Sequence, residues 1–340
     1  MKNKELNFLE GTNRRSFLKF LSLIGLGLFS SPDTLWGEDI YPTKSITWLI
    51  PYKPGGGFDI FARGISPYLE KHLKKTSPKT KGGSIFIKNE PAAAGEKAIS
   101  ILFNTPPDGY TIGSFTGAFL AEKFLAKKDY DIAKLSYLVR VDEMTRLLVT
   151  RKSGPKNWNE IVALSKTSPI KWGVGAFGRE IHLTSIIANE VLGIPARYIA
   201  FGGTAESLNA LIRGDVHMIT VSEDSAKVLI DAGEIRVLLS FDKKSIYPDA
   251  PSIQDLGHPE LINPTKGNRF LAGPPGLPKS IEKIIVGAFE QACKDEEFLA
   301  WSKKSGFEPT PIYREDLEKL VKEVTEFYKE KTPLIKKHLE

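Results

Sequence analysis

Two loops of small residues near the start of the chain could bind an anion through the backbone. The loop Pro51–Asp59 contains three successive glycines and follows the apolar run Ile46–Ile50, and the loop Asn89–Gly95 contains three alanines and follows Ile85–Ile87. Each loop stands between a predicted strand and a predicted helix, where α/β proteins present free backbone N–H groups to anions. Asp59 stands at the predicted helix start, where its carboxylate can accept hydrogen bonds from free amides. The pattern predicts a site for a small anion.

A third loop, Trp172–Gly178, is rich in glycine and also lies between a predicted strand and a predicted helix. It satisfies the Gly-x-Gly-x-x-Gly pattern, which is typical of dinucleotide-binding proteins. In such proteins the next strand ends in an acidic residue that binds the ribose, whereas here the run Ala196–Phe201 continues into Gly202 and Gly203. We therefore interpret these glycines as a second loop that faces an anion. A cofactor-dependent enzyme is kept as the leading alternative.

Arg179 and His182 follow this loop, at the start of the predicted helix Glu180–Leu192. An arginine in the first turn of a helix faces the positive end of the helix dipole, which is unfavourable by a few tenths of a kcal/mol. A ligand carboxylate between the guanidinium and the helix amides would remove the conflict, and we hypothesise such a contact. The alternative is an exposed Arg179 that pairs with Glu180 or a neighbour. His182 is interpreted as a structural hydrogen-bonding residue, because no nucleophile and orienting acid accompany it.

Strand-like and helix-like runs alternate along the chain, which predicts an α/β protein. The predicted strands are Ile46–Ile50, Ile85–Lys88, Thr111–Phe115, Leu147–Thr150, Lys171–Val174, Ala196–Phe201, His217–Val221 and Ile235–Phe241. The predicted helices are Asp59–Leu73, Glu96–Asn104, Asn157–Ser165, Glu180–Leu192, Thr204–Arg213, Ser222–Asp231, Ser280–Cys293 and Arg314–His338. Pro67 predicts a break in the first helix near Gly64–Pro67.

The chain is predicted to cross between two lobes near Val139–Thr145 and again near Phe241–Leu256. We expect a discontinuous first lobe, residues 38–143 with 251–340, and an inserted second lobe, residues 144–250. Each lobe is expected to contain a mainly parallel sheet flanked by helices. A cleft between two lobes is a common location for a ligand.

The first residues resemble an export signal and not a domain. Asn13-Arg-Arg-Ser-Phe-Leu-Lys19 is a twin-arginine pattern, and the apolar stretch Phe20–Phe29 that follows it is too short to span a membrane. We expect residues 1–37 to be an export signal and the protein to be periplasmic. The only cysteine, Cys293, lies far from this segment and has no partner for an internal disulfide.

Composition excludes several other classes of protein. The formal net charge is +6, and the charged residues are interspersed, so no basic stripe for nucleic acid is present. The five histidines are dispersed and no cysteine pair exists, so we expect no metal site. No apolar run of about eighteen residues occurs in the predicted mature chain.

A set of motifs in a fixed order resembles a known family. It comprises Tyr41-Pro-Thr-Lys44, the loops Pro51–Asp59 and Asn89–Gly95, Pro107-Asp-Gly-Tyr-Thr111, Gly202-Gly203, Leu211-Ile-Arg-Gly-Asp-Val216, Ala232-Gly-Glu-Ile-Arg236 and Tyr247-Pro-Asp-Ala-Pro-Ser252. Together these motifs, over residues 41 to 325, resemble the solute receptors of tripartite tricarboxylate transporters, the Bug-type periplasmic binding proteins. The resemblance implies a two-lobed flytrap fold. It also implies that backbone amides of the first loop and ordered waters hold a ligand carboxylate.

The resemblance and the loop positions together define the predicted site. In chain order, the expected ligand-contacting residues are Gly55, Gly56, Gly57, Phe58, Asp59, Ala93, Ala94, Gly95, Thr116, Gly117, Gly175, Ala176, Phe177, Arg179, His182, Phe201, Gly202, Gly203, Thr204 and Ser222.

Some of these residues depart from the family's pattern. The alanines before Gly95 replace much of a glycine-rich segment, and Arg179 replaces a small hydroxyl residue. Phe58 replaces a small polar residue and Phe201 replaces a tyrosine. These two phenylalanines favour a more apolar or aromatic carboxylate, unless they belong to the core.

These observations predict an exported, monomeric receptor that closes on a small organic carboxylate and docks on a membrane permease of the tripartite tricarboxylate type. Closure requires the ligand to contact both lobes. We expect no catalysis, no cofactor and no nucleic-acid partner. A receptor domain that feeds a sensor kinase stays open as a second alternative, because transport and sensing use the same closure.

Overall fold

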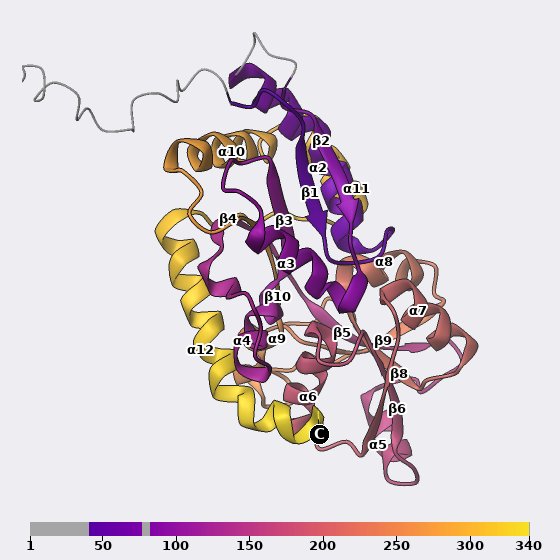
Figure 1. The fold of residues 1–340 in the computed structure, drawn as a ribbon. Helices are drawn as coiled ribbons and strands as arrows, with labels where there is room; N and C mark the ends of the chain where they lie inside the picture. Colours follow the sequence, from indigo (N-terminus) through magenta and orange to yellow (C-terminus); the bar gives the residue numbers. More distant parts are fainter. Residues whose placement is uncertain (1–40, 77–81, 340) are drawn as a thin grey trace, which may run out of the picture. The chain divides into compact units, whose positions relative to one another are not determined.

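Two five-stranded sheets organise the part of the chain that the computed structural model describes, residues 41–76 and 82–339 (Figure 1). The predicted export signal, residues 1–37, lies outside the described residues. Helices flank both sheets, so the structure confirms the predicted α/β class.

The first sheet, here sheet A, has the strand order β2-β1-β3-β10-β4. Its strands in chain order are β1 (Ile46–Ile50), β2 (Ile85–Asn89), β3 (Thr111–Thr116), β4 (Ser136–Met144) and β10 (Gly267–Gly273). β1 pairs in parallel with β2 and β3, whereas β10 is antiparallel to β3 and β4.

The second sheet, here sheet B, has the order β7-β6-β8-β5-β9. Its strands are β5 (Arg146–Arg151), β6 (Ile170–Val174), β7 (Ala196–Ala200), β8 (Met218–Ser222) and β9 (Ile235–Ser240). β6 pairs in parallel with β7 and β8, whereas β5 is antiparallel to β8 and β9.

Each sheet is therefore evenly mixed, where mainly parallel sheets were expected. The difference comes from the segments that pass between the sheets. β4 and β5 are separated by Thr145 alone, so the chain runs out of sheet A and directly into sheet B. β10 then returns to sheet A between β3 and β4. β4 and β10 were not among the predicted strands.

Most predicted helices are present with similar bounds. The helices between β1 and β4 and after β10 are α2 (Gly57–Thr76), α3 (Glu96–Asn104), α4 (Glu122–Leu125), α10 (Lys279–Ala292), α11 (Glu296–Ser305) and α12 (Arg314–Leu339). Those that follow β5 to β9 are α5 (Trp158–Ser165), α6 (Glu180–Leu192), α7 (Thr204–Arg213), α8 (Glu223–Asp231) and α9 (Ile262–Thr265). No described helix combines the length and apolar character needed to span a membrane.

The predicted break of the first helix is wrong, because α2 continues through Pro67. Pro67 lies on the exposed face of α2, where water can bind the carbonyl that loses its helical donor. The hydroxyl of Ser66, the residue before Pro67, donates to the carbonyl of Ala62 at 2.5 Å. The buried side chains of Ile65 and Leu69 on either side keep the helix packed against the core.

A fully buried tryptophan occupies the core of each sheet. Trp48 in β1 donates its indole N–H to the Ser114 hydroxyl in β3 at 2.7 Å, and Trp172 in β6 donates to the Thr220 hydroxyl in β8 at 2.9 Å. Both pairs join neighbouring parallel strands, so each satisfies a buried donor while it packs a large apolar surface.

α12 connects elements of the two sheets (Figure 1). It contacts β4 and α4, which precede β5, and also α6, which follows β6. Its buried residues include Leu317 near its start and Ile335 near its end, so the helix packs along most of its length.

Gly64 in α2 lies against the indole of Trp301 in α11, and a Cβ atom there would come within 2.0 Å of the ring. We predict that Gly64→Ala lowers the free energy of unfolding by about 1–3 kcal/mol, because the indole must move. Gly287→Ala in α10 is the matched control, since nothing lies within 4 Å of its Cβ position. We expect that substitution to stabilise the protein by about 0.5–1 kcal/mol. Urea unfolding measures both, and equal effects would contradict the packing of α2 on α11.

Candidate ligand-binding site

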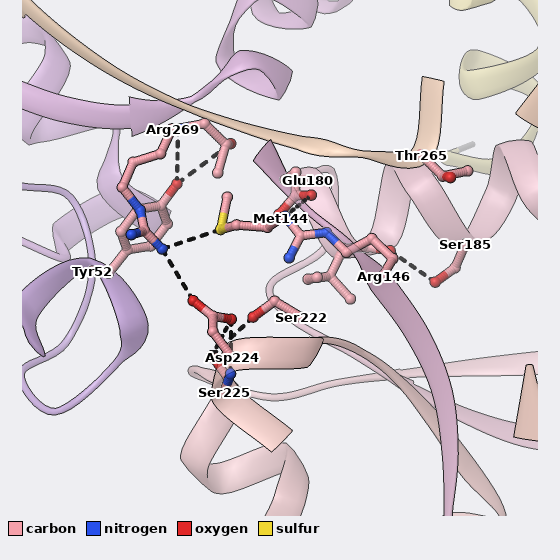
Figure 2. A network of polar contacts seen from close by, with 12 residues as sticks. Tyr52, Met144, Arg146, Glu180, Ser185, Ser222, Asp224, Ser225, Thr265 and Arg269 are labelled. Carbon is pink, nitrogen blue, oxygen red and sulfur yellow. Dashed lines mark hydrogen bonds and ion pairs between the residues drawn. The ribbon is translucent and has the colours of Figure 1, made fainter. Parts of the chain in front are cut away.

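A cavity of about 290 Å³ lies between elements of sheet A and elements of sheet B. On the side of sheet A, the cavity is lined by residues of its strands, of α2 and of the loop between β1 and α2, which include Tyr52, Gly57, Phe58, Thr116, Met144 and Arg269. Residues of the sheet B elements that line it include Arg146, Gly175, Arg179, Glu180, Gly203, Ser222 and Asp224. Figure 2 shows several of these side chains directed toward one another.

Helix N-termini converge on this cavity. The first residues of α2 and α7, Gly57 and Thr204, line it, as do Glu180 at the start of α6 and Asp224 in the first turn of α8. The first N–H groups of a helix have no partner within the helix, and the helix dipole makes this end attractive to anions.

The N-cap residues of three helices at the cavity do not cap them through their side chains. Arg179, Gly203 and Ser222 occupy the N-cap positions of α6, α7 and α8, and none makes a side-chain cap hydrogen bond. Away from the cavity, the side chains of Asn157 and Asp295 cap α5 and α11. α10 is also uncapped, so a missing cap alone marks nothing. What distinguishes the cavity is that several uncapped starts open onto one space.

Arg269 in β10 is the most enclosed cation at the cavity, with 1% of its side chain exposed. Its guanidinium donates to Asp142 in β4 at 2.9 Å. It also donates to Asp224 in α8 at 3.2 Å (Figure 2). It also lies over the rings of Phe58 and Phe61, 4.8 and 4.9 Å from their centroids. Burial raises the pKa of Asp142 to about 6, although Arg269 opposes the change.

Arg146 in β5 forms a second buried ion pair. Its Nη2 donates to Oε1 of Glu180, and 2% of the arginine side chain and 13% of the glutamate side chain are exposed. A Cβ atom at Gly267 would collide with this guanidinium at 1.9 Å, so β10 accommodates Arg146 by having a glycine there. Burial raises the pKa of Glu180, and the charge of Arg146 opposes the change.

Arg179 joins the start of α6 to elements that precede β4. It pairs with Glu122 and with Glu96, the latter at 2.5 Å, and also donates to the carbonyl of Ala93 at 3.3 Å. The guanidinium predicted to contact a ligand is thus engaged by carboxylates of the protein, although Arg179 also lines the cavity. A direct ligand contact stays a prediction.

Further contacts connect the two sides of the cavity. Lys53 pairs with Glu206 at 3.6 Å, and both side chains are more than half exposed. A Cβ atom at Gly57 would lie 3.2 Å from a carboxylate oxygen of Asp224 and 3.3 Å from the Ser225 hydroxyl. The glycine loop before α2 is therefore in close approach to the start of α8.

The alanine loop adopts the conformation that glycine would favour. Ala93 and Ala94 have φ of 51° and 54°, in the left-handed region where a Cβ atom costs about 1–2 kcal/mol. Asp59 lies in the first turn of α2 and accepts from the amide of Gly55 at 3.0 Å, so its carboxylate holds the loop before the helix and not a helix amide.

His182 has a structural position. Its ring accepts from the amide of Gly178 at 3.0 Å and lies edge to face between Phe177 and Tyr198, 4.9 and 5.1 Å from their centroids. Burial lowers the pKa of His182 to about 4, so the ring is neutral and positions the loop before α6.

The structure brings most of the predicted site residues to the cavity. Those that line it are Gly56, Gly57, Phe58, Ala94, Thr116, Gly175, Ala176, Arg179, Gly202, Gly203, Thr204 and Ser222. Those that lie outside its lining are Gly55, Asp59, Ala93, Gly95, Gly117, Phe177, His182 and Phe201. Phe201 packs instead with the apolar residues between sheet B and its helices.

Apart from Arg179, the charged residues of the cavity were not predicted from the sequence. Arg146, Glu180, Asp224 and Arg269 line it, and so do Tyr52 and Met144. A usable signal existed for the two arginines. Each begins or interrupts an apolar strand, as Arg146 before Leu-Leu-Val and Arg269 before Phe-Leu-Ala, and arginine is rarely buried without a partner.

Two mixed sheets with a cavity between them, onto which helix N-termini open, define a two-lobed solute receptor of the periplasmic-binding-protein type. The model of the tripartite tricarboxylate transporter family receptor matches residues 70–339, and the chain belongs to that family. It is a solute-binding protein and not an enzyme. A UPF0065 protein of Bordetella pertussis is 27% identical over 292 residues, covering 84% of this chain and 87% of the relative. Protein BugT of Bordetella pertussis is 24% identical over 252 residues, covering 72% and 73%.

Solved structures confirm the fold. The periplasmic binding protein BugD has a TM-score of 0.76 at 21% identity and covers 87% of this chain and 98% of its own. MatC from Rhodopseudomonas palustris, solved with bound malate, has a TM-score of 0.72 at 21% identity, covering 88% and 100%. The R. palustris protein Rpa4515, solved with adipate, has a TM-score of 0.74 at 23% identity, covering 87% and 98%.

The buried position of His182 predicts an unusual titration. We expect its ring resonances in NMR spectra to titrate near pH 4, against about 6.5 for a free histidine, and to disappear in His182→Asn. Because the folded pKa is depressed, the stability from neutral His182 is present above about pH 6.5 and is lost as the pH falls through 4. Titration near pH 6.5 would show that the ring is exposed and does not hold the loop.

Proposed function

We propose that this protein is an exported, monomeric receptor that binds a small organic carboxylate in the cavity between the two sheets. It then delivers this ligand to a membrane permease of the tripartite tricarboxylate type. The bound carboxylate accepts hydrogen bonds from backbone amides at the starts of α2, α6 and α7, and the location is the periplasm.

The observation that carries this proposal is the set of uncapped helix starts around one enclosed space. The N-cap residues of α6 and α7 make no side-chain cap hydrogen bond, while the arginines at the cavity already pair with carboxylates of the protein. The first-turn amides are therefore the donors left for an anion. A carboxylate there would satisfy orphan N–H groups and interact favourably with the helix dipoles.

The comparisons support the class of ligand. The family is one of tripartite tricarboxylate transporter receptors, and the similar proteins MatC and Rpa4515 were solved with malate and adipate. Both of those ligands are small carboxylates, and a cavity of about 290 Å³ suits a molecule of that size.

We further propose that the two sheets with their helices are lobes that close on the ligand. Charged pairs that join the two sides, such as Arg179 with Glu122 and Arg269 with Asp224, would stabilise the closed arrangement. The first lobe boundary is proposed at Thr145. Since Ser252 pairs with Ser240 and α9 contacts α6, the second boundary is better placed near Lys266 than at residue 250.

Thermal unfolding of the purified protein against mono-, di- and tricarboxylates, with and without amino groups, tests the proposal. A ligand at 100 times its dissociation constant is expected to add about 2.7 kcal/mol, which raises the melting temperature by several degrees. Uncharged analogues such as the corresponding alcohols serve as controls. If no carboxylate shifts the transition of ligand-free protein, the proposed function is wrong.

Gly57→Val tests the location of the site. The added side chain would press on Asp224 and Ser225 across the cavity, so we expect carboxylate affinity, measured by calorimetry, to fall on the order of tenfold or more. Gly287→Ala, whose Cβ meets open space in α10, should bind as the unmodified protein does. Unchanged affinity in Gly57→Val would place the ligand elsewhere.

A further inference from the structure

The cations around the cavity are already matched or outnumbered by protein carboxylates. Arg269 is shared by Asp142 and Asp224, and Arg179 is shared by Glu96 and Glu122. Within the described part of the chain, each arginine that lines the cavity pairs with at least one carboxylate. A ligand that brings a second negative charge would therefore meet acids and not free cations.

Among the described arginine–carboxylate pairs at the cavity, Arg146–Glu180 is the one in which each member keeps an unused polar atom that is not fully enclosed. Only Nη2 of Arg146 and Oε1 of Glu180 hydrogen-bond within the described residues. Within this part of the chain, Nη1 of Arg146 and Oε2 of Glu180 are unpaired but not fully enclosed. Nε of Arg146, in contrast, is both unpaired there and fully enclosed. Both residues line the cavity, which is the space from which a ligand would reach these two atoms.

The arginine is built into this position. The Arg146 side chain is 2% exposed. β10 has Gly267 beside it, where any larger residue would collide with the guanidinium. Glu180 is the first residue of α6, where the helix dipole favours its negative charge. The pair thus presents a fixed donor beside a fixed acceptor at the cavity wall (Figure 2).

A donor beside an acceptor complements a group that offers both functions. A primary amide accepts from an arginine through its oxygen and donates to a glutamate through its nitrogen. An amino acid does the same through its carboxylate and ammonium. A lone second carboxylate can only accept, and it would bring a like charge against Glu180 and the nearby Asp224, which disfavours the charged form.

We propose that the Arg146–Glu180 pair is the specificity determinant of the site, and that it selects a carboxylate that also carries a nitrogen donor, as an amide or an ammonium group. One carboxylate of the ligand binds the helix amides, and the nitrogen donates to Glu180. This inference rests on the proposed carboxylate-receptor function. It separates this chain from a receptor that prefers simple dicarboxylates.

Length-matched ligands test the proposal by calorimetry on the purified protein. Glutarate is compared with its monoamide and with glutamate, and succinate and adipate are compared with their monoamides. We expect the nitrogen-bearing ligand of the best-bound length to bind at least about tenfold more tightly than the dicarboxylate. Equal or tighter binding of the dicarboxylate would overturn the inference and leave the proposed function intact. If no ligand of any length binds, the proposed function fails, and the inference with it.

Glu180→Gln provides the second arm, because it removes the charge and one acceptor while it can still bond to Arg146. We expect the monoamide-to-dicarboxylate affinity ratio to fall to about 1. Glu190→Gln is the matched control, since it removes the same charge from an exposed position near the other end of α6 and should keep the ratio. A ratio unchanged in Glu180→Gln would overturn the assignment. The ratio in the unmodified protein tests the proposal even if Glu180→Gln fails to fold.

Discussion

The guanidinium of Arg269 lies inside the protein with almost none of its surface in water, and a cation in that position must be neutralised by nearby carboxylates. Asp142 in β4 and Asp224 in α8 meet this requirement from opposite sides. β10 and β4 are thereby tied to the start of α8, an element of the other sheet. Removing one partner of such a pair leaves an uncompensated buried charge, which costs about 3–5 kcal/mol. This pairing therefore helps to hold the two sheets in their relative position at the cavity.

The same requirement determines what a ligand can meet. Since Arg269, Arg179 and Arg146 are neutralised within the protein, none is left free to act as the main counter-ion of a ligand. Under the proposed function, anion binding would fall to backbone amides, which is consistent with the glycine loop before α2 and with the left-handed conformation that Ala93 and Ala94 accept despite its strain. Selectivity among anions must come from polar atoms that the ion pairs leave unused.

Elements with strong local patterns were predictable from the sequence. α3, α6 and α7 have the predicted bounds, because their apolar spacing and flanking glycines are local signals. β4 and β10 were not predicted, since Arg140, Asp142 and Arg269 interrupt their apolar runs. Asp142 and Arg269 are tolerated inside the sheet because their partners come from distant segments, whereas Arg140 pairs with Glu143 of the same strand. The helix break predicted at Pro67 was wrong for a related reason, because tertiary packing of α2 outweighs the local preference for a break.

The backbone part of the site was predictable, whereas among the charged residues that line it only Arg179 was predicted. Glycine loops after strands can be recognised from composition alone. Gly57, Gly175 and Gly203, which belong to such loops, all line the cavity. Arg146 and Glu180 are 34 residues apart and come from a strand and a helix, so no spacing rule connects them. The arginine nevertheless carries information, because a charged residue at the start of an apolar strand must find a partner when the strand is buried. Its partner and the atom it leaves unused become visible only in the folded chain, and in a receptor that atom is where ligand specificity can arise.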